Sequence, residues 1–365
     1  MNAEIMQTEK TEVAIIGAGP IGIELAIALQ EAGIDYVLIE ANQVGDAFMK
    51  WPPNTHFFST PEHVALAGVP VHNLDQRSIT GEQYLAYLRT LVEMFDLNLR
   101  VYEPVTAVIP QEESGFIVKT THRLGEKQYE CRYVVLATGG MAGPRLLNIP
   151  GEDLPHVSHY FPGPHHFFHT RLLIVGGRNS AAEAALRCWR VGATDIAMSY
   201  RRPELNFERI KPHLSVDLGD RLEKGEITFY PSTVPVEITP KHVVLASTED
   251  GVTLNGSVIK HEADFVYLAT GFRADMSLFA DAGVQLVGEA ERPYFNEVTM
   301  ETNVKGLFVA GTAAGGTQER FTYFISTSHD HVAKITKAIT GQLPAKLGTI
   351  QGRNNAVTWE EVKTN

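Results

Sequence analysis

A single stretch, Thr11 to Glu40, constrains the fold of this chain more than any other. Its first part, Val13 to Ile16, is a short apolar run of the kind that forms a parallel strand buried on both faces. A glycine-rich turn, a helical segment and a second apolar strand follow, and that second strand ends at Glu40. The stretch therefore predicts a strand–helix–strand unit that opens an α/β fold.

The turn of this unit fits the pattern G-x-G-x-x-G, which is typical of a dinucleotide-binding fold. Gly17 permits the tight turn, Gly19 lets a pyrophosphate approach the backbone, and Gly22 lets the helix pack closely on the strand. The start of the helix offers unpaired N–H groups to the phosphates, and an acid at the end of the second strand can bind both ribose hydroxyls. A purely structural unit would explain the turn but not the acid. The binding residues predicted here are Gly17, Gly19, Pro20, Gly22 and Glu40.

A second unit of the same kind begins at Arg171. Arg171 to Gly177 is an apolar strand that runs into glycines, and an Ala-rich helix follows from Asn179 to about Arg190. Gly192 ends this helix, and Asp195 to Tyr200 forms the next strand. The chain therefore predicts two dinucleotide-binding units.

The second unit differs from the first at the end of its second strand, where Arg201-Arg202 replaces an acid. Two guanidinium groups suit a ribose 2′-phosphate, so NADPH is favoured over NADH. Its turn fits G-x-G-x-x-A only if Arg178 takes the place of the middle glycine. An ordinary unit with a surface arginine pair is the alternative interpretation. The predicted cofactor-binding residues are Gly176, Arg178, Asn179, Ser180, Arg201 and Arg202.

Composition limits the classes of function. The chain has 365 residues, enough for two domains, and a formal net charge of −12 without a basic run, so we expect no nucleic-acid partner. The N-terminus is polar, unlike a signal peptide, and no apolar stretch approaches the roughly 18 residues that span a bilayer. Two cysteines do not indicate a disulfide framework. These features predict a cytoplasmic enzyme without a membrane partner.

The end of the chain is less informative. From Pro344 onward the sequence loses its periodicity. This predicts a mobile tail or an arm that packs on a partner, and it leaves a homo-oligomer open.

Three further apolar strands complete the pattern. Tyr133 to Gly140 ends in Ala-Thr-Gly, and Asp264 to Phe272 repeats that ending. Leu307 to Gly311 reads Leu-Phe-Val-Ala-Gly and enters a glycine-rich turn. The order along the chain is thus nucleotide motif, ATG strand, nucleotide motif, ATG strand and VAG turn.

That order resembles the two-dinucleotide-fold flavoproteins, which include thioredoxin reductases, glutathione-reductase relatives and class B monooxygenases. The resemblance implies an α/β fold with two Rossmann-like domains, in which the first unit binds FAD and the second binds NADPH. It also implies that the NAD(P)H domain, residues 157–292, is inserted into a discontinuous FAD domain, residues 1–156 and 293–365.

The same resemblance implies further cofactor contacts. The ATG segment contributes Thr138 and Gly139, and the VAG turn places Gly311 and Thr312 near the ribitol phosphate, with a helix that begins near Thr317 and points its N-terminus at the flavin. Thioredoxin reductases usually carry Gly-Asp in this turn, so the Gly-Thr of this chain departs from the pattern.

Several irregular segments resemble the bacillithiol-disulfide reductases more specifically. These are WPPNTHFFST from Trp51, His159-Tyr160-Phe161, the segment 175–181, Ile210-Lys211-Pro212 and the VAG turn. The resemblance implies that Trp51 and Phe58 also lie at the cofactor site, and that the acceptor is a small molecule such as a low-molecular-weight disulfide.

The chain departs from that family at its reactive thiol. Family members carry a cysteine in the first glycine turn, where this chain has Ile21, and isoleucine cannot form a mixed disulfide. The Cys-x-x-Cys pair of thioredoxin reductases is also absent. Cys131, predicted to begin the strand before the first ATG, and Cys188, on the helix of the second unit, are both predicted to be buried structural residues. We therefore expect no relay through a protein dithiol.

The histidines offer weaker signals. His156, His159, His165, His166 and His169 are interleaved with Pro and Gly, and no acid or thiol completes a ligand set, so we predict no metal.

A second signal begins at Phe161-Pro162-Gly163, which starts the F-x-G-x-x-x-H signature of class B monooxygenases but has Phe167 where the histidine belongs. His329 and His331 lie on the predicted helix after the VAG turn. His331 is the candidate for proton transfer, with a core or surface histidine as the alternative.

Three functions remain open at this point. The first is an FAD-dependent NADPH oxidoreductase that passes electrons through flavin to a small acceptor without a protein dithiol. The second is a flavin monooxygenase that oxygenates nitrogen or sulfur. The third is a flavin-bearing redox sensor that is not an enzyme.

Overall fold

The computed structural model describes residues 7–74, 77–318 and 322–348. Contacts divide the chain into two compact units. Unit 1 comprises residues 1–50, 54–143 and 272–365, and unit 2 comprises residues 51–53 and 144–271. The contacts thus place the division at 143/144 and 271/272, while the predicted domain boundaries at 156/157 and 292/293 stay a prediction from motif order.

Unit 1 is built on a seven-stranded sheet in the order β3-β2-β1-β6-β5-β4, with β19 beside β6. The strands β2, β1, β6 and β19 run parallel, and β5 and β4 join them antiparallel. The strands are β1 Gln7–Ile16, β2 Tyr36–Ile39, β3 Leu99–Arg100, β4 Val105–Pro110, β5 Phe116–His122, β6 Gly125–Leu136 and β19 Leu307–Val309.

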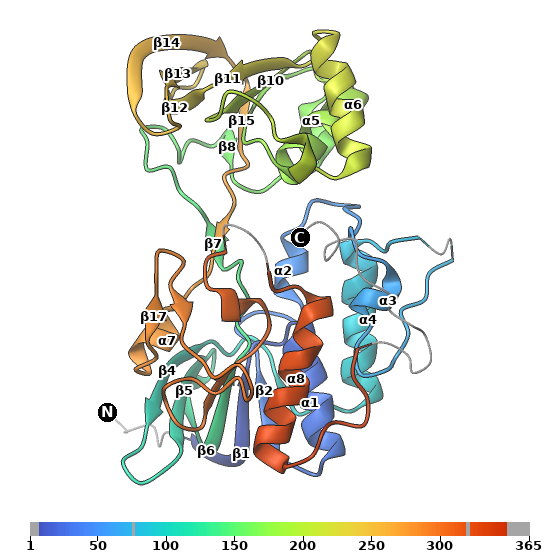
Figure 1. The fold of residues 1–365 in the computed structure, drawn as a ribbon, viewed down its shortest axis with the longest axis vertical. Helices are drawn as coiled ribbons and strands as arrows, with labels where there is room; N and C mark the ends of the chain where they lie inside the picture. Colours follow the sequence, from blue (N-terminus) through green and yellow to red (C-terminus); the bar gives the residue numbers. More distant parts are fainter. Residues whose placement is uncertain (1–6, 75–76, 319–321, 349–365) are drawn as a thin grey trace. The chain divides into compact units, whose positions relative to one another are not determined.

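Helices pack on this sheet, and Figure 1 shows α8 lying alongside α1. The helices of unit 1 are α1 Pro20–Glu31, α2 Asp46–Met49, α3 Pro61–Val64, α4 Gly81–Met94, α7 Ser277–Asp281 and α8 Ile325–Thr340, with the 3₁₀ helix η3 Gly311–Gly315. Two short strand pairs remain. In unit 1, β17 Leu286–Val287 pairs with β18 Arg292–Pro293. The strand β7 Gly143–Pro144 pairs with β16 Phe272–Arg273, at the residues where the division between the units falls.

Unit 2 has its own parallel sheet, in the order β11-β10-β9-β15-β8, and an antiparallel sheet β12-β13-β14. The parallel strands are β8 Val157–Ser158, β9 Arg171–Val175, β10 Asp195–Tyr200, β11 Thr228–Pro231 and β15 Phe265–Leu268. The antiparallel strands are β12 Thr233–Ile238, β13 His242–Thr248 and β14 Leu254–Glu262. The helices are α5 Asn179–Val191, α6 Pro212–Glu223, η1 Pro164–Phe167 and η2 Phe207–Arg209.

The predicted fold class is confirmed, because both nucleotide motifs form strand–turn–helix–strand units within parallel sheets. In unit 1 the motif strands β1 and β2 are adjacent, and in unit 2 β9 and β10 are adjacent. Gly192 ends α5 in a left-handed conformation, as predicted.

Two predicted element boundaries are wrong. Cys131 lies in the middle of β6, because the strand starts at Gly125 by pairing with β5. The helix expected near Thr317 is α8, which begins at Ile325. The residues described between η3 and α8 are not helical, and Gly316, with φ of +57°, breaks the 3₁₀ turn.

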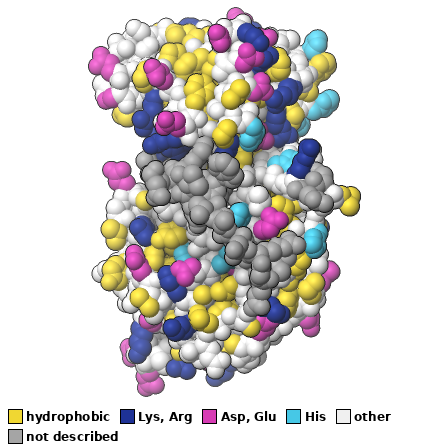
Figure 2. Space-filling view, turned by 45° about the vertical axis from the view of Figure 1, so that its right-hand side comes forward, with side chains coloured by type: hydrophobic (Ala, Val, Ile, Leu, Met, Phe, Trp, Pro, Cys, Tyr) yellow, Lys and Arg dark blue, Asp and Glu magenta, His cyan; other side chains and the backbone are white. Residues whose placement is uncertain are grey.

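The outer surface carries charges of both signs. In Figure 2, Lys and Arg side chains are interspersed with Asp and Glu side chains over the face that is drawn. Among the residues that the structure describes, none of the helices is long and apolar enough to cross a membrane. Of the predicted tail, residues 344–348 are described, and residues 349–365 lie outside the described part.

Candidate functional site

Of the three motif glycines in the first turn, one borders open space. Gly17 has φ of +110°, and a Cβ there would lie 2.5 Å from the carbonyl oxygen of Ala137. A Cβ on Gly22 would lie 1.9 Å from the carbonyl oxygen of Gly17. A Cβ on Gly19, in contrast, would meet no atom within 4 Å. Gly17 and Gly22 are therefore required by the fold itself, whereas Gly19 borders a space that a ligand can enter.

The helix α1 starts beside that space without a side-chain cap. Gly19 is its N-cap and Pro20 its first residue, and no side chain accepts a hydrogen bond from the first turn. By contrast, α4 carries a full capping box, in which Thr80 accepts from the backbone N–H of Gln83. The N–H groups at the start of α1 thus remain available to an anion such as a phosphate.

The acid of the first motif is held rigidly next to the turn. One carboxylate oxygen of Glu40 accepts a 2.8 Å hydrogen bond from the N–H of Ala18, and the other accepts a 2.9 Å bond from the N–H of Asn42. Burial raises the pKa of Glu40, while these two backbone hydrogen bonds oppose the rise. Each oxygen keeps a free lone pair, so the carboxylate can accept from ribose hydroxyls as well.

The ATG segment and the VAG turn meet at the ends of neighbouring strands. The N–H of Ala310 bonds to the carbonyl of Leu136 at 3.0 Å, which aligns the two segments. A Cβ on Gly140 would lie 3.5 Å from Oγ1 of Thr312. The hydroxyl of Thr138 is buried and has no hydrogen-bond partner among the residues that the structure describes. A buried hydroxyl without a partner is costly, so this atom fits a site where a bound group completes the bond.

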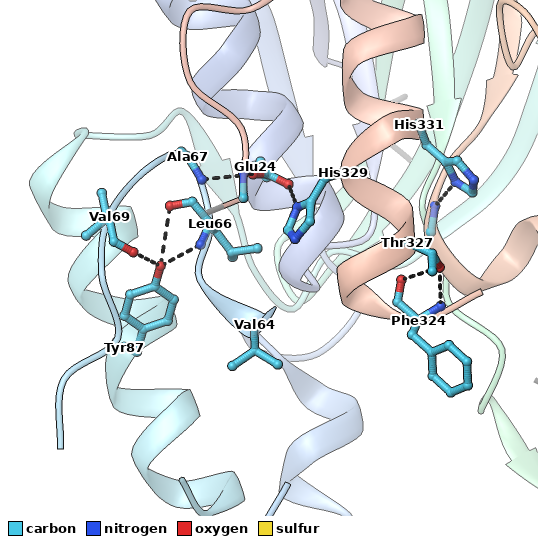
Figure 3. A network of polar contacts seen from close by, with 12 residues as sticks. Glu24, Val64, Leu66, Ala67, Val69, Tyr87, Phe324, Thr327, His329 and His331 are labelled. Carbon is cyan, nitrogen blue, oxygen red and sulfur yellow. Dashed lines mark hydrogen bonds and ion pairs between the residues drawn. The ribbon is translucent and has the colours of Figure 1, made fainter. Parts of the chain in front are cut away.

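The VAG turn also contacts Ile21, which lies in the first glycine turn. Gly311 has φ of +70°, and a Cβ built on it would lie 3.5 Å from Cβ of Ile21. The N–H of Gly311 donates a 3.1 Å hydrogen bond to Nδ1 of His331, on α8 (Figure 3). His331 is 4% exposed, and this burial lowers its pKa to about 4. An aliphatic side chain and a neutral imidazole therefore flank the turn.

The remaining predicted residue of the turn anchors a loop. The hydroxyl of Thr317 accepts a 3.0 Å bond from the N–H of Ala274, and its own N–H bonds to the carbonyl of Ala290 at 2.7 Å. Its neighbour Gln318 was not predicted. The Gln318 amide donates to the carbonyl of Thr312 at 3.2 Å and accepts from the N–H of Thr322 at 2.8 Å. No signal in the sequence distinguishes this glutamine from a surface residue.

The motif of unit 2 forms a comparable turn. Gly176 has φ of +147°, and a Cβ there would lie 2.7 Å from the carbonyl oxygen of Ala269. Arg178 is the N-cap of α5 and provides no side-chain cap, and both Arg178 and Ser180 are exposed. Asn179 uses its side-chain oxygen to accept a 2.8 Å bond from the N–H of Lys211. Asn179 is thus committed to a structural bond, while Ser180 is exposed at the start of the helix.

The arginine pair lies at the same edge of the sheet as this turn. The strands β9 and β10 are parallel and in register, and the N–H of Gly176 bonds to the carbonyl of Ser199 at 3.0 Å. Arg201 and Arg202 follow directly and are exposed. The ring of Tyr200 covers Gly177, where a Cβ would lie 2.6 Å from the ring. This contact explains by packing why position 177, which the motif leaves variable, is a glycine.

Comparison with known proteins decides the family. Residues 14–311 match the family model described as pyridine nucleotide-disulphide oxidoreductase. The chain belongs to this family. It is 32% identical, over 83% of its length and 89% of the relative, to bacilliredoxin reductase Bdr of Bacillus subtilis (strain 168).

Solved structures extend the likeness. Bacillithiol disulfide reductase Bdr from Bacillus cereus superposes with a TM-score of 0.84 at 32% identity, over 91% of this chain and 99% of that one. The enzyme of the same name from Staphylococcus aureus gives 0.83 at 29% identity over the same shares. A flavin-containing monooxygenase from Stenotrophomonas maltophilia, at 21% identity and a TM-score of 0.65 over 91% and 99%, shares the fold.

The family is one of FAD/NAD(P)H-dependent oxidoreductases, so this pyridine nucleotide-disulphide oxidoreductase is a flavoprotein enzyme with a thioredoxin-reductase-like fold. Its two cysteines, however, lie outside the glycine turns. Cys131 is 7% exposed on β6 and Cys188 is fully buried on α5, and burial raises the pKa of each thiol to about 12. Both thiols are therefore protonated at neutral pH and shielded from solvent.

The other residues predicted from the sequence do not take part in the contacts described above for the two glycine turns. Trp51 belongs to unit 2 and Phe58 to unit 1, so their place at the cofactor site stays a prediction. Nε2 of His156 lies 3.2 Å from the carbonyl oxygen of Thr239, and Nε2 of His159 lies 3.2 Å from the carboxylate of Glu152. Among the residues described, no three His, Cys, Asp or Glu side chains gather as a metal site would require.

The near-miss signature of the monooxygenases also has a structural explanation. The ring of Phe161 stacks on the ring of Phe167, with centroids 5.5 Å apart, in the core of unit 2. Phe167, at the position of the histidine in that signature, is therefore a packing residue here.

Proposed function

We propose that unit 1 binds FAD, that unit 2 binds NADPH, and that the protein passes electrons from NADPH to a small acceptor, a low-molecular-weight disulfide, without a protein dithiol. The observation that carries this proposal is the place of Ile21. It lies against Gly311 in the turn where the bacillithiol-disulfide reductases carry a cysteine, while both cysteines of the chain are buried elsewhere.

The residues of unit 1 fit FAD. The space at Gly19 and the uncapped start of α1 suit a pyrophosphate, and the fixed carboxylate of Glu40 suits the adenosine ribose. The unpartnered hydroxyl of Thr138 suits a polar group of the same cofactor. FAD, when bound, accepts a hydride from the nicotinamide and gives up an electron pair to the acceptor.

The residues of unit 2 fit NADPH. The start of α5 is uncapped, and Arg201 and Arg202 are exposed at the same edge of the sheet. Guanidinium groups bind a 2′-phosphate through charge-assisted hydrogen bonds, which the hydroxyl of NADH cannot replace. These two arginines therefore support a preference for NADPH.

The proposed reaction balances without a protein thiol. NADPH and one proton reduce one disulfide to two thiols, with NADP⁺ as the second product. Neither Cys131 nor Cys188 exposes a thiolate that could attack the disulfide, so the route avoids a mixed disulfide with the protein. The printed names of the relatives favour bacillithiol disulfide as the first acceptor to test.

Anaerobic titration with NADPH tests this function. The purified protein is reduced with one equivalent of NADPH, and reoxidation is followed after adding bacillithiol disulfide, glutathione disulfide, cystine and then air. We expect reoxidation by one disulfide with release of two thiols. Reoxidation by oxygen alone, with an oxygenated product, would favour a monooxygenase, and failure of NADPH to bleach the protein would favour a sensor.

The variant Ile21→Cys supplies the matched comparison. The side chain at position 21 is 6% exposed and lies on the first turn of α1, where the helix dipole favours a thiolate. We expect this variant to form a mixed disulfide with the acceptor, whereas the native chain forms none. Mass spectrometry of the trapped protein distinguishes the two.

A further inference from the structure

We infer that His331 is a positioning residue, which acts as a permanent hydrogen-bond acceptor for the N–H of Gly311 and thereby fixes the turn that meets the flavin. The inference rests on the proposed FAD site of unit 1. It assigns to His331 a role other than the proton transfer that its position in the sequence predicts.

The hydrogen bond itself determines the tautomer of the ring. A backbone N–H can only donate, so Nδ1 of His331, 3.1 Å from the nitrogen of Gly311, must carry a lone pair. The one proton of the neutral ring is therefore on Nε2. Protonation of Nδ1 would place two donors face to face and would break the bond.

The surroundings keep the ring neutral. His331 is 4% exposed on α8, and the ring of Tyr323 approaches it edge-on with centroids 5.1 Å apart. The charged neighbours on the same helix, Asp330 and Lys334, act on the ring in opposite directions, and burial outweighs both. A ring in this environment is a poor proton donor at neutral pH.

The bond matters because of what the Gly311 peptide contacts. Gly311 adopts φ of +70°, and its Cα faces Ile21. The following residue, Thr312, lies against Gly140 of the ATG segment and receives a bond from Gln318 on its carbonyl. His331 thus fixes the peptide plane between Ala310 and Gly311, and Gln318 fixes the peptide plane between Thr312 and Ala313, so that the backbone of the turn keeps one orientation.

A pair of amide substitutions separates this role from proton transfer. The side-chain oxygen of His331→Asn takes the position of Nδ1 and can accept from Gly311, whereas that of His331→Gln takes the position of Nε2 and cannot. Both variants are polar, similar in size and unable to transfer a proton. We expect the Asn variant to keep the flavin absorption spectrum, the flavin reduction potential and the rate of reduction by NADPH. The Gln variant should shift the spectrum and lose roughly tenfold in rate, as one buried backbone hydrogen bond predicts.

Two outcomes would overturn the inference. Equal loss in both variants, together with loss of a pH dependence present in the native protein, would assign proton transfer to His331. Equal retention in both would leave the bond without influence on the flavin.

A readout without turnover completes the test and does not depend on the proposed function. Two-bond ¹H–¹⁵N NMR of histidine-labelled protein reports the ring tautomer directly, with the His331→Asn variant assigning the signal. We expect a neutral Nε2–H ring from pH 8 to pH 5. An Nδ1–H ring, or a ring that titrates near pH 6.5, would overturn the inference, whereas absence of FAD or of reduction by NADPH in the native protein would overturn only the proposed function.

Discussion

The carboxylate of Glu24 lies 2.6 Å from Nδ1 of His329, although the two residues are 305 positions apart in the chain (Figure 3). Glu24 is fully buried on α1, and its other oxygen accepts hydrogen bonds from the N–H groups of Ala67 and Gly348. One carboxylate on α1 therefore binds three other segments, which are α8, the loop after α3 and the segment after α8. The helix α1 is the one that starts at the first glycine turn. This makes Glu24 a structural centre of unit 1.

The first prediction concerns this network. We expect Glu24→Ala to reduce the free energy of unfolding by about 3–5 kcal/mol, because it leaves an imidazole and two N–H groups without partners. Glu24→Gln keeps an acceptor for the backbone and should cost about 1–2 kcal/mol. Urea denaturation measures both. The control is Glu31→Gln, which breaks the surface pair with Lys346 and should cost less than about 1 kcal/mol. Equal effects at the two positions would contradict the account.

The second prediction concerns the space beside Gly19. A Cβ at position 19 meets no atom within 4 Å among the described residues, and the backbone there has an ordinary φ of −77°, so Gly19→Val should fold normally. Its branched side chain would occupy the pyrophosphate path, and we expect colourless protein without FAD. Gly143→Val, at another glycine with an open environment and without a positive φ, should stay yellow. Flavin content per folded chain, with circular dichroism as the folding control, is the measurement. Full FAD in the Gly19 variant would refute the assignment of this turn.

The third prediction concerns Arg201 and Arg202. Replacing both with serine should reduce kcat/KM for NADPH at least roughly a hundredfold, because each charge-assisted phosphate contact is worth about 1.5–3 kcal/mol, a factor of roughly ten to a hundred, and two such contacts are lost. The value for NADH should hardly change, since only the 2′-phosphate contact is lost. Stopped-flow reduction of the flavin with each cofactor decides this. Lys260→Ser removes an exposed cation from β14 of the same unit and should affect neither cofactor. Equal losses for both cofactors would mean that the arginines act on the fold or on the pyrophosphate.

The fourth prediction concerns pH. The pKa of His331 is about 4 in the folded protein and about 6.5 when unfolded, so between these values the unfolded chain binds a proton that the folded chain does not. Stability should therefore fall as the pH is lowered from 6.5 towards 4, with a contribution from this residue of about 3 kcal/mol. His331→Asn lacks this contribution and should show a shallower fall in urea denaturation between pH 7 and pH 5. Glu40, whose pKa is raised by burial, acts in the opposite direction and is common to both proteins. Parallel pH profiles of the two proteins would contradict the burial of a neutral ring.

The sequence predicts those parts of the fold that depend on local geometry. The two strand–turn–helix units follow from apolar strands and from glycines such as Gly17 and Gly176, whose positive φ and close carbonyl neighbours exclude a side chain. The buried state of Cys131 and Cys188 also follows from their places in regular elements. Such features are encoded within a few residues, so they can be recognised without a structure.

Other parts depend on contacts between distant segments. The start of α8 at Ile325 depends on a 3₁₀ turn, on the break at Gly316 and on the bond between Thr317 and Ala274. Likewise, Glu24 looks like an ordinary charged position on a helix, and nothing near it in the sequence indicates His329. The acceptor role of Nδ1 in His331 also requires the fold, because Gly311 lies 20 residues earlier on another element.

The central claim is that electrons reach the acceptor without a protein thiol, and a cysteine-free protein tests it most directly. Cys131→Ser and Cys188→Ser are combined, flavin content is confirmed, and the protein is reduced anaerobically with NADPH and mixed with the disulfide that reoxidises the native protein. We predict that the variant is reoxidised at the native rate and releases two thiols per flavin. Loss of reoxidation by the disulfide, with full flavin and normal reduction by NADPH, would show that one of these cysteines carries the reaction and would contradict the account.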